Sequence, residues 1–272
     1  MTIYIYLVRH AQGQHNVAAD HTLRDPDLTA LGIEQSTQLA ISFPYHDRIT
    51  HLISSPMRRT LRTCFYGFKN RGKGDDNGTR KPILALPELQ ELSTMPCDVG
   101  SSVAKLDAEF NTSEEKVVDL SELPDGWQLF KLDSNSLFAP NMDRLEKRAW
   151  QARRRLREIG QKYERDHPGQ DAHIVVVSHG AFIHFLTGDW EGMTKEGQAG
   201  TDWRNAEWRV FEFVEGDEDE VRLRETEESW RRRKGDTPRL TETQQRELKT
   251  NVERVLEEDK KEWKKVTVCF QE

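Results

Sequence analysis

The chain has 272 residues, of which 35% are hydrophobic and 32% are charged. This length can form one sizeable α/β domain with a buried core. No stretch approaches the roughly twenty consecutive apolar residues that a membrane-spanning helix requires, and a net charge of −7 argues against general nucleic-acid binding. The cysteines Cys64, Cys97 and Cys269 lack metal-site spacing and favour a reduced, cytoplasmic protein.

Short apolar runs alternate with helical patterns in the first part of the chain. Residues 2–8 are β-branched and aromatic, which predicts a buried strand, and they lack the basic start and cleavage site of a signal peptide. Apolar residues recur at helical spacing from Thr29 onward. A second strand is predicted over residues 51–54, followed by a helix that carries Arg58 and Arg59. Residues 83–86 form a third short apolar run.

The pattern becomes irregular between about residues 91 and 140, where prolines and glycines predict loops and short helices. Asn141 is a suitable N-cap for a long amphipathic helix, whose arginines are expected on the face opposite its apolar stripe. Residues 174–177 read Ile-Val-Val-Val, the strongest buried-strand signal in the chain. Residues 209–213 alternate and predict an edge strand.

This alternation of strands and helices predicts a three-layer α/β/α sandwich with a mostly parallel central sheet. We assign residues 1–214 to this domain, with about 92–140 as a lid over its site, and 215–272 to a charged, mainly helical C-terminal extension. Thr241 to Gln244 resembles a capping box, and the apolar residues that follow share one helical face. This helix is expected to pack on the domain or to form a homodimer.

The segment after the first strand carries the first candidate site. In an open α/β sheet, ligands bind beyond the carboxyl ends of the strands, where Arg9 and His10 must lie. The arginine offers a fork of donors that matches phosphate oxygens. A histidine can act as a nucleophile if it is neutral and its other ring nitrogen is held. Asn16 can donate a further hydrogen bond. In isolation, however, an Arg-His dipeptide is more often a surface ion pair of the arginine next to a histidine whose hydrogen bonds are satisfied.

Residues at the ends of two further strands favour a functional role for Arg9 and His10. His179 and Gly180 follow the buried strand at 174–177, at the same edge of the sheet. Arg59 lies in the first turn of the helix after the second strand, near backbone N–H groups that favour anions. Together the three strand ends supply two arginines and two histidines, a set suited to a phosphate pocket. His184, on the apolar helix that follows, is instead expected to be a satisfied core histidine.

These motifs resemble the histidine phosphatase superfamily, over about residues 3–214. Its Arg-His-Gly signature is matched by Arg9-His10-Ala11, its asparagine by Asn16, and its second histidine by His179. Ser55-Pro56-x-x-Arg59 matches its Ser-Pro-x-x-Arg element. The variant Arg-His-Ala-Gln-Gly-x-His-Asn is most similar to a fungal or plant branch. Ala11 replaces the usual glycine, and we expect a slightly altered loop with retained chemistry.

The resemblance implies a phosphatase that forms a phosphohistidine on His10 and needs neither metal nor cofactor. Arg9, Arg59 and a cationic His179 would stabilise the transferring phosphoryl group, with Asn16 as a further phosphate contact. A carboxylic acid is expected after the third strand in a Leu-x-Glu pattern. Glu91 fits this pattern best, Glu88 is the alternative, and Asp98 is a third candidate.

Two other functions stay open. A phosphoglycerate mutase would share this fold, but its Glu-Arg-His-Tyr-Gly-like segment is missing around Glu91. A scaffold that binds a phosphorylated ligand without turnover is the second alternative. The expected partner is a small-molecule phosphate ester, whose identity the sequence leaves open. A basic run at residues 231–234 could direct the protein to the nucleus, but its acidic neighbours favour a solvated helix face.

Overall fold

A seven-stranded mixed sheet forms the centre of the computed structural model, which describes residues 1–69, 82–112, 116–195, 198–199 and 201–267. Its strand order is β4-β3-β2-β5-β1-β8-β9. The parallel strands are β1 (Ile3–Arg9), β2 (His51–Ser54), β3 (Ile83–Ala85), β4 (Val118–Asp119) and β5 (Ala172–Ser178). The antiparallel strands are β8 (Trp208–Phe213) and β9 (Leu223–Glu225). The predicted mostly parallel α/β fold is confirmed.

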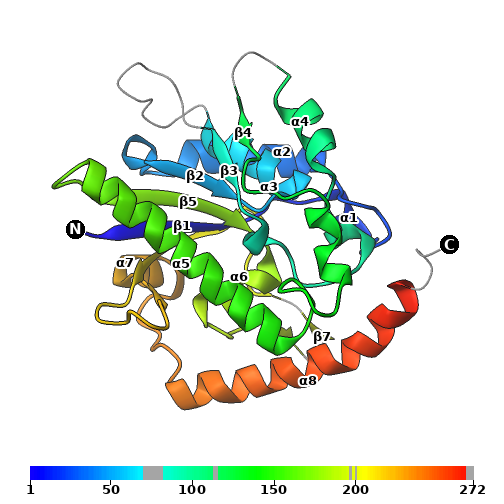
Figure 1. Cartoon of the computed structure of the whole chain (residues 1–272). Coiled ribbons are helices and arrows are strands. Elements are labelled where there is room, and N and C mark those ends of the chain that lie inside the picture. Colours follow the sequence, from blue (N-terminus) through cyan, green and yellow to red (C-terminus); the bar gives the residue numbers. More distant parts are fainter. Residues whose placement is uncertain (70–81, 113–115, 196–197, 200, 268–272) are drawn as a thin grey trace.

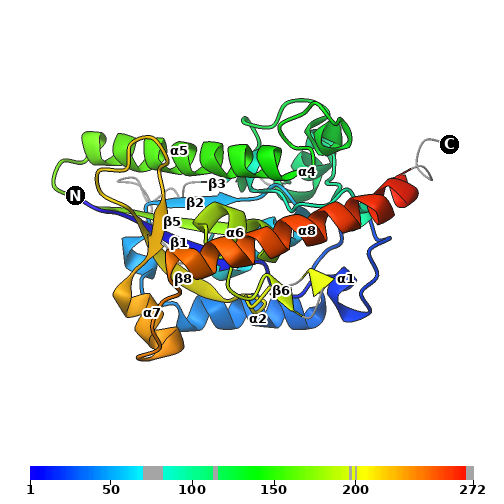
Figure 2. The same cartoon turned by 90° about the horizontal axis from the view of Figure 1, so that it is seen from below.

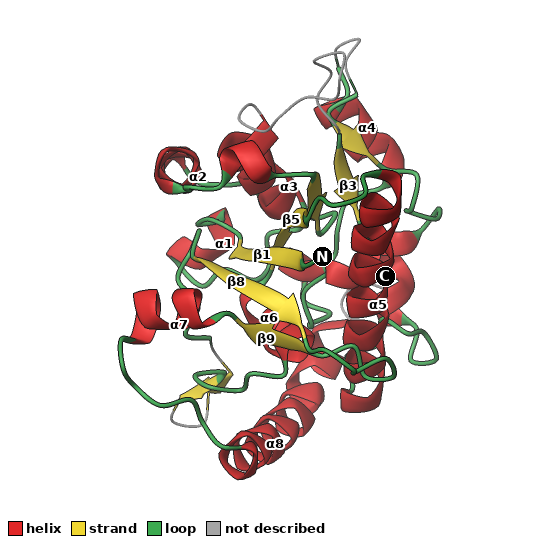
Figure 3. Cartoon of the chain, turned by 90° about the vertical axis from the view of Figure 1, so that its left-hand side faces the viewer, coloured by secondary structure: helices red, strands yellow, loops and turns green. Residues whose placement is uncertain are grey.

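Helices cover both faces of this sheet (Figures 1 and 3). Alternate side chains of β1 point to opposite faces, as strand geometry requires. Ile5 and Leu7 pack with α5 (Met142–Asp166) and α6 (Gly180–Thr187), whereas Tyr6 and Val8 pack with α2 (Ala30–Ser42) and α3 (Arg58–Cys64). Every residue of β5 is buried. The other α-helices among the described residues are α1 (Gln14–Val17), α4 (Val103–Phe110), α7 (Glu227–Lys234) and α8 (Glu242–Thr267), and short 3-10 or π turns lie at His46–Arg48, Phe65–Lys69, Pro87–Leu89, Pro96–Asp98 and Trp127–Leu132.

The predicted helix starts are found at the capping residues. The Thr29 hydroxyl accepts from the backbone N–H of Gly32 at 3.0 Å, and the Asn141 amide oxygen accepts from that of Arg144 at 3.1 Å. At the start of α8, the Gln244 side chain accepts from the backbone N–H of Thr241 at 2.9 Å and its own N–H donates back to the Thr241 hydroxyl. The predicted capping box of the C-terminal helix is therefore present.

One predicted position in the sheet is wrong. Residues 208–213 are an inner strand, because β8 pairs with β1 on one side and with β9 on the other. Strand β9 was missed because it has only three residues inside a highly charged segment. The division of the chain at residue 214 stays a prediction, although the sheet continues beyond it.

The C-terminal helix α8 lies against the domain, past α6 and a small hairpin of β6 (Thr194–Lys195) and β7 (Gln198–Ala199) (Figures 1 and 2). Its residues Val252, Val255 and Leu256 are buried. The expected packing of this helix on the domain is therefore observed, and its role in a homodimer stays a prediction. Within the described ranges, no helix is long and apolar enough to span a bilayer.

Candidate functional site

The three predicted strand ends meet at one edge of the sheet. Strand β5 lies between β1 and β2, and Arg9 pairs in register with Ser178 while Ser54 pairs with Val177. His10 and His179 directly follow β1 and β5, and Arg59 lies in the first turn of α3, after β2, so the three side chains come from neighbouring strand ends. The ring centroids of the two histidines are 5.3 Å apart. Arg59 donates to the Nδ1 atom of His179 at 3.1 Å.

His10 has the state that a nucleophile requires. Its Nδ1 atom lies 2.7 Å from the carbonyl oxygen of Ala11, which can only accept, so Nδ1 carries the proton and Nε2 keeps a free lone pair. Burial, and then the charges of Arg59 and Arg9, hold the pKa of His10 well below its usual value. The imidazole is therefore neutral and oriented. Ala11 is fully buried, and its N–H donates to the Thr63 hydroxyl at 3.0 Å, which fixes the loop.

The structure corrects the predicted charge of His179. Because Nδ1 accepts from Arg59, Nε2 carries the proton and donates to the Ser55 hydroxyl at 2.8 Å. Burial lowers the pKa of His179 well below its usual value, and the charge of Arg59 lowers it further. The ring is thus neutral. The sequence pattern missed this because it places the arginine beside the histidine but does not reveal the burial of both.

Hydrogen bonds to other residues of the protein hold the Arg59 side chain in place. Only 1% of the residue is exposed, and it donates to the carbonyl oxygen of Cys97 at 2.6 Å and to the Asp98 carboxylate at 2.8 Å. Ser93 donates to the other Asp98 oxygen at 2.5 Å. Burial would raise the pKa of Asp98, but Arg59 and Lys131 outweigh it and hold that pKa below its usual range. Asp98 is thus an ionised partner of the arginine, which disfavours it as the acid.

Asn16 braces the loop that follows His10. Its amide oxygen accepts from the backbone N–H of Gly13 at 2.9 Å, and its amide nitrogen donates to His15 at 3.0 Å. Burial and the charge of Arg59 lower the pKa of His15 to about 3, and its ring centroid lies 5.8 Å from that of His10. Asn16 was predicted to contact phosphate. Its described hydrogen bonds go to His15 and to the backbone of the loop.

Of the two glutamates, Glu91 is the one whose charge interacts with Arg9 and Arg59. Its carboxylate accepts from the backbone N–H groups of Ala181 at 3.3 Å and Phe182 at 3.0 Å, in the first turn of α6. Burial, and then the charge of Asp98, raise the pKa of Glu91. Burial also raises the pKa of Glu88, but the charges that act on it are those of Arg155, Glu122 and Arg148, and neither Arg9 nor Arg59 is among them. The geometry therefore favours Glu91 as the acid.

Two buried cations near Glu91 escaped the sequence prediction. Lys131 donates to the carbonyl oxygens of Asp98 at 2.6 Å and Glu91 at 3.2 Å, and burial lowers its pKa to about 8. Arg148 donates to the carbonyl oxygen of Gln90 at 3.0 Å, and its guanidinium lies 4.3 Å from the ring centroid of Phe182. Arg148 is fully buried, so the expectation that the arginines of α5 face away from the core is wrong at this position.

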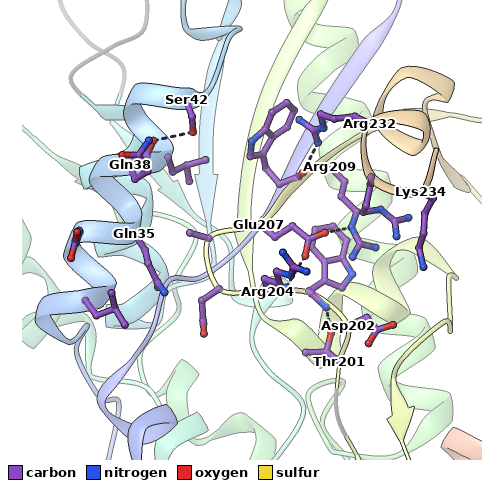
Figure 4. A pocket seen from close by; sticks show the side chains of 18 residues that line it. Gln35, Gln38, Ser42, Thr201, Asp202, Arg204, Glu207, Arg209, Arg232 and Lys234 are labelled. Carbon is purple, nitrogen blue, oxygen red and sulfur yellow. Dashed lines mark hydrogen bonds and ion pairs between the residues drawn. The ribbon is translucent and has the colours of Figure 1, made fainter.

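Residues 201–207 hold the chain at the end of β1 in place. The carbonyl oxygen of Trp203 accepts from Arg9, and Asn205 donates to the carbonyl oxygen of His10 at 3.0 Å. The same segment forms one wall of a groove of about 1240 Å³, with α2 on the other side and residues 232–234 at its end (Figure 4). The groove is separate from the histidines, because none of the proposed catalytic residues lines it.

The fold and the convergence of two arginines and two histidines at one sheet edge are in keeping with the family that the motifs resemble. Residues 5–226 match the histidine phosphatase superfamily (branch 1), and the chain belongs to this family. Within the described residues, no group of three or more His, Cys, Asp or Glu side chains could hold a metal ion.

Named relatives include phosphatases and mutase-like proteins. Phosphoglycerate mutase-like protein 1 of Arabidopsis thaliana is 31% identical over 150 residues, covering 43% of this chain and 53% of its own length. A probable phosphatase of Schizosaccharomyces pombe is 34% identical over 109 residues, covering 39% and 49%. The chain thus spans about half the length of these curated relatives. The ecdysone phosphate phosphatase of Bombix mori shares the fold, with a TM-score of 0.51 at 16% identity over 77% of this chain and 88% of that one.

Proposed function

We propose that this protein hydrolyses a phosphate monoester through a phosphohistidine on His10, with Glu91 as general acid and base. The observation that carries the proposal is the buried His10, whose Nδ1 is held by the carbonyl oxygen of Ala11 and whose pKa is lowered by burial and by the charges of Arg59 and Arg9. Its Nε2 lone pair attacks phosphorus in line, and the bond to the ester oxygen breaks as the P–N bond forms. Arg9 and Arg59 stabilise the charge on the equatorial oxygens.

Glu91 supplies and recovers the proton. Burial and the charge of Asp98 raise its pKa, which favours the protonated carboxyl that can donate to the leaving alkoxide. The ionised carboxylate then takes a proton from water, whose oxygen attacks the phosphohistidine. The P–N bond breaks, inorganic phosphate forms and His10 returns to its neutral state. The arginines carry the positive charge that a metal ion supplies in other phosphatases, so the reaction is proposed to be metal-independent.

Asp98 also interacts with the charges of Arg59 and Glu91 in the pocket. Asp98 neutralises Arg59 and raises the pKa of Glu91 through like-charge repulsion. A phosphate group that binds Arg59 has to share this guanidinium with Asp98. We propose that Asp98 prevents a tight, unproductive complex with free phosphate, and that a small-molecule ester is the substrate class.

The test is phosphate release by purified wild type, His10→Ala and the matched control His167→Ala, whose histidine is exposed at the end of α5. The substrates are a broad panel of phosphomonoesters that includes 3-phosphoglycerate, with and without chelator and vanadate. Expected are chelator-resistant, vanadate-sensitive turnover and an acid-labile phosphoenzyme, both lost only in His10→Ala. Metal-dependent turnover that survives in His10→Ala would refute the mechanism. Conversion of 3-phosphoglycerate to its isomer would instead support the mutase alternative.

A further inference from the structure

The C-terminal helix α8 lies outside the part of the chain that matches the family, yet it is joined to the pocket by hydrogen bonds. The side chain of Gln245 makes two of them with the turn after α6. Its amide nitrogen donates to the Asp189 carboxylate at 2.9 Å, and its amide oxygen accepts from the backbone N–H of Trp190 at 2.8 Å. Because both the nitrogen and the oxygen of this amide form hydrogen bonds with the turn, Gln245 holds the turn in place.

The same turn holds the buried side chain of His184. The Nδ1 atom of His184 lies 2.6 Å from the carbonyl oxygen of Asp189, which can only accept, so Nδ1 carries the proton. Its Nε2 atom lies 3.0 Å from the hydroxyl of Thr201 and is left as the acceptor. Only 1% of His184 is exposed. The expected satisfied core histidine is therefore present, and it bridges α6 to the segment of residues 201–207.

Thr201 connects His184 to the phosphate pocket. Its hydroxyl accepts from the backbone N–H of Trp203 at 3.2 Å, and the carbonyl oxygen of that residue accepts from Arg9 (Figure 4 shows Thr201 on this segment). The methyl group of Thr201 also lies against Gly180, next to the Arg9 guanidinium. Trp203 is buried in the same hydrophobic cluster as Val252 and Leu256 of α8. The contacts thus run without a gap from Gln245 to Arg9.

We infer that α8 positions Arg9 for phosphate binding, with Gln245 and Thr201 as the positioning residues of this connection. The inference rests on the proposed function, in which Arg9 binds the transferring phosphoryl group. With its Nη1 atom held by Trp203, the guanidinium presents its remaining donors in one orientation, so less conformational freedom is lost when phosphate binds. Neither Gln245 nor Thr201 needs to touch the substrate.

The test measures binding of inorganic phosphate and vanadate by calorimetry, together with kcat and KM for an accepted phosphomonoester. Gln245→Ala and Thr201→Val are compared with Lys249→Ala, which removes the ion pair between α8 and Glu146 on α5. Gln245→Ala and Thr201→Val are expected to weaken binding about 3- to 10-fold, the range that contact networks commonly transmit, and to raise KM more than they lower kcat. Thr201→Ser, which keeps the hydroxyl, is expected to restore binding.

A double-mutant cycle separates positioning from a merely structural role. In an Arg9→Lys background the fork is absent, so Thr201→Val is expected to have no further effect on phosphate affinity. An undiminished effect there would overturn the inference, as would a folded Gln245→Ala that binds phosphate like Lys249→Ala while wild type is active. A wild type that neither binds vanadate nor hydrolyses any ester would overturn the proposed function and this inference together.

Discussion

Replacing Asp98 by asparagine tests the charge arrangement of the pocket. The substitution keeps the shape of the side chain but removes the partner of Arg59, a pair at 2.8 Å in which 1% and 8% of the two side chains are exposed. Loss of one partner from a buried pair commonly costs about 3–5 kcal/mol, because the other charge stays buried without compensation. Asparagine can still accept from the guanidinium, so we expect the lower end, about 3 kcal/mol.

The assay is thermal and urea unfolding of wild type, Asp98→Asn and the exposed control Asp47→Asn between pH 3 and 8. At about 2–4 °C per kcal/mol, the melting temperature of Asp98→Asn at pH 7 is expected to fall by about 6–12 °C. The pKa of Asp98 is depressed in the folded state, so its contribution is present above its unfolded pKa and is lost as the pH falls through the folded value. The difference between wild type and variant should therefore narrow in the acidic part of the series. A difference below about 1 kcal/mol at pH 7, or one that does not change with pH, would refute this reasoning.

Three further predictions concern the same pocket. In Gly180→Ala the added methyl would lie 2.5 Å from Thr201 Cγ2 and 3.1 Å from Arg9 Nε, so phosphate affinity measured by calorimetry should fall about 10-fold or more; unchanged affinity would contradict the placement of Arg9. Lys131 has a folded pKa of about 8, below its unfolded value, so wild-type stability should rise between about pH 8 and 10.5, and Lys131→Met should lack this rise in urea unfolding. Glu91 must be protonated to donate, so wild-type kcat/KM should fall as the pH rises through its raised pKa. In Glu91→Gln this pH dependence should disappear and kcat should drop about 10²- to 10⁴-fold; a retained alkaline limb would assign it to another group.

The part of the site that could be predicted from the sequence lies at the ends of the buried strands. Buried strands have a strong sequence signal, and the carboxyl ends of parallel neighbours must meet at one edge of the sheet. Arg9, His10 and His179 directly follow such strands, and Arg59 opens the next helix, so their convergence needed no knowledge of long-range packing. The family resemblance then added their roles, and the structure shows that these four residues do come together.

The remainder of the site depends on contacts that local patterns do not encode. Lys131 reaches Asp98 and Glu91 from an irregular segment, where no periodicity shows which side chains turn inward. Arg148 could have been found, because it follows Leu145 by three positions and precedes Ala152 by four, on the buried stripe of α5. It was assigned to the polar face because arginine is rarely buried without a partner. The neutral state of His179 likewise follows from burial, which the motif does not specify.

Burial makes the ionised forms of His10 and Glu91 costly to the fold, and it thereby shifts both groups toward the protonation states that the proposed reaction needs. A histidine in water is partly protonated near neutral pH and a carboxylic acid is ionised, so neither would be ready to attack phosphorus or to donate a proton. Desolvation shifts both toward their neutral forms, and Arg59 and Asp98 act in the same direction on their respective neighbours. In the proposed mechanism, Glu91 is ionised after the first transfer, while the positive charges of the arginines near the phosphohistidine remain in place. The arrangement therefore suits both halves of the reaction because the arginines keep their charge throughout while one proton moves between Glu91, the leaving group and water.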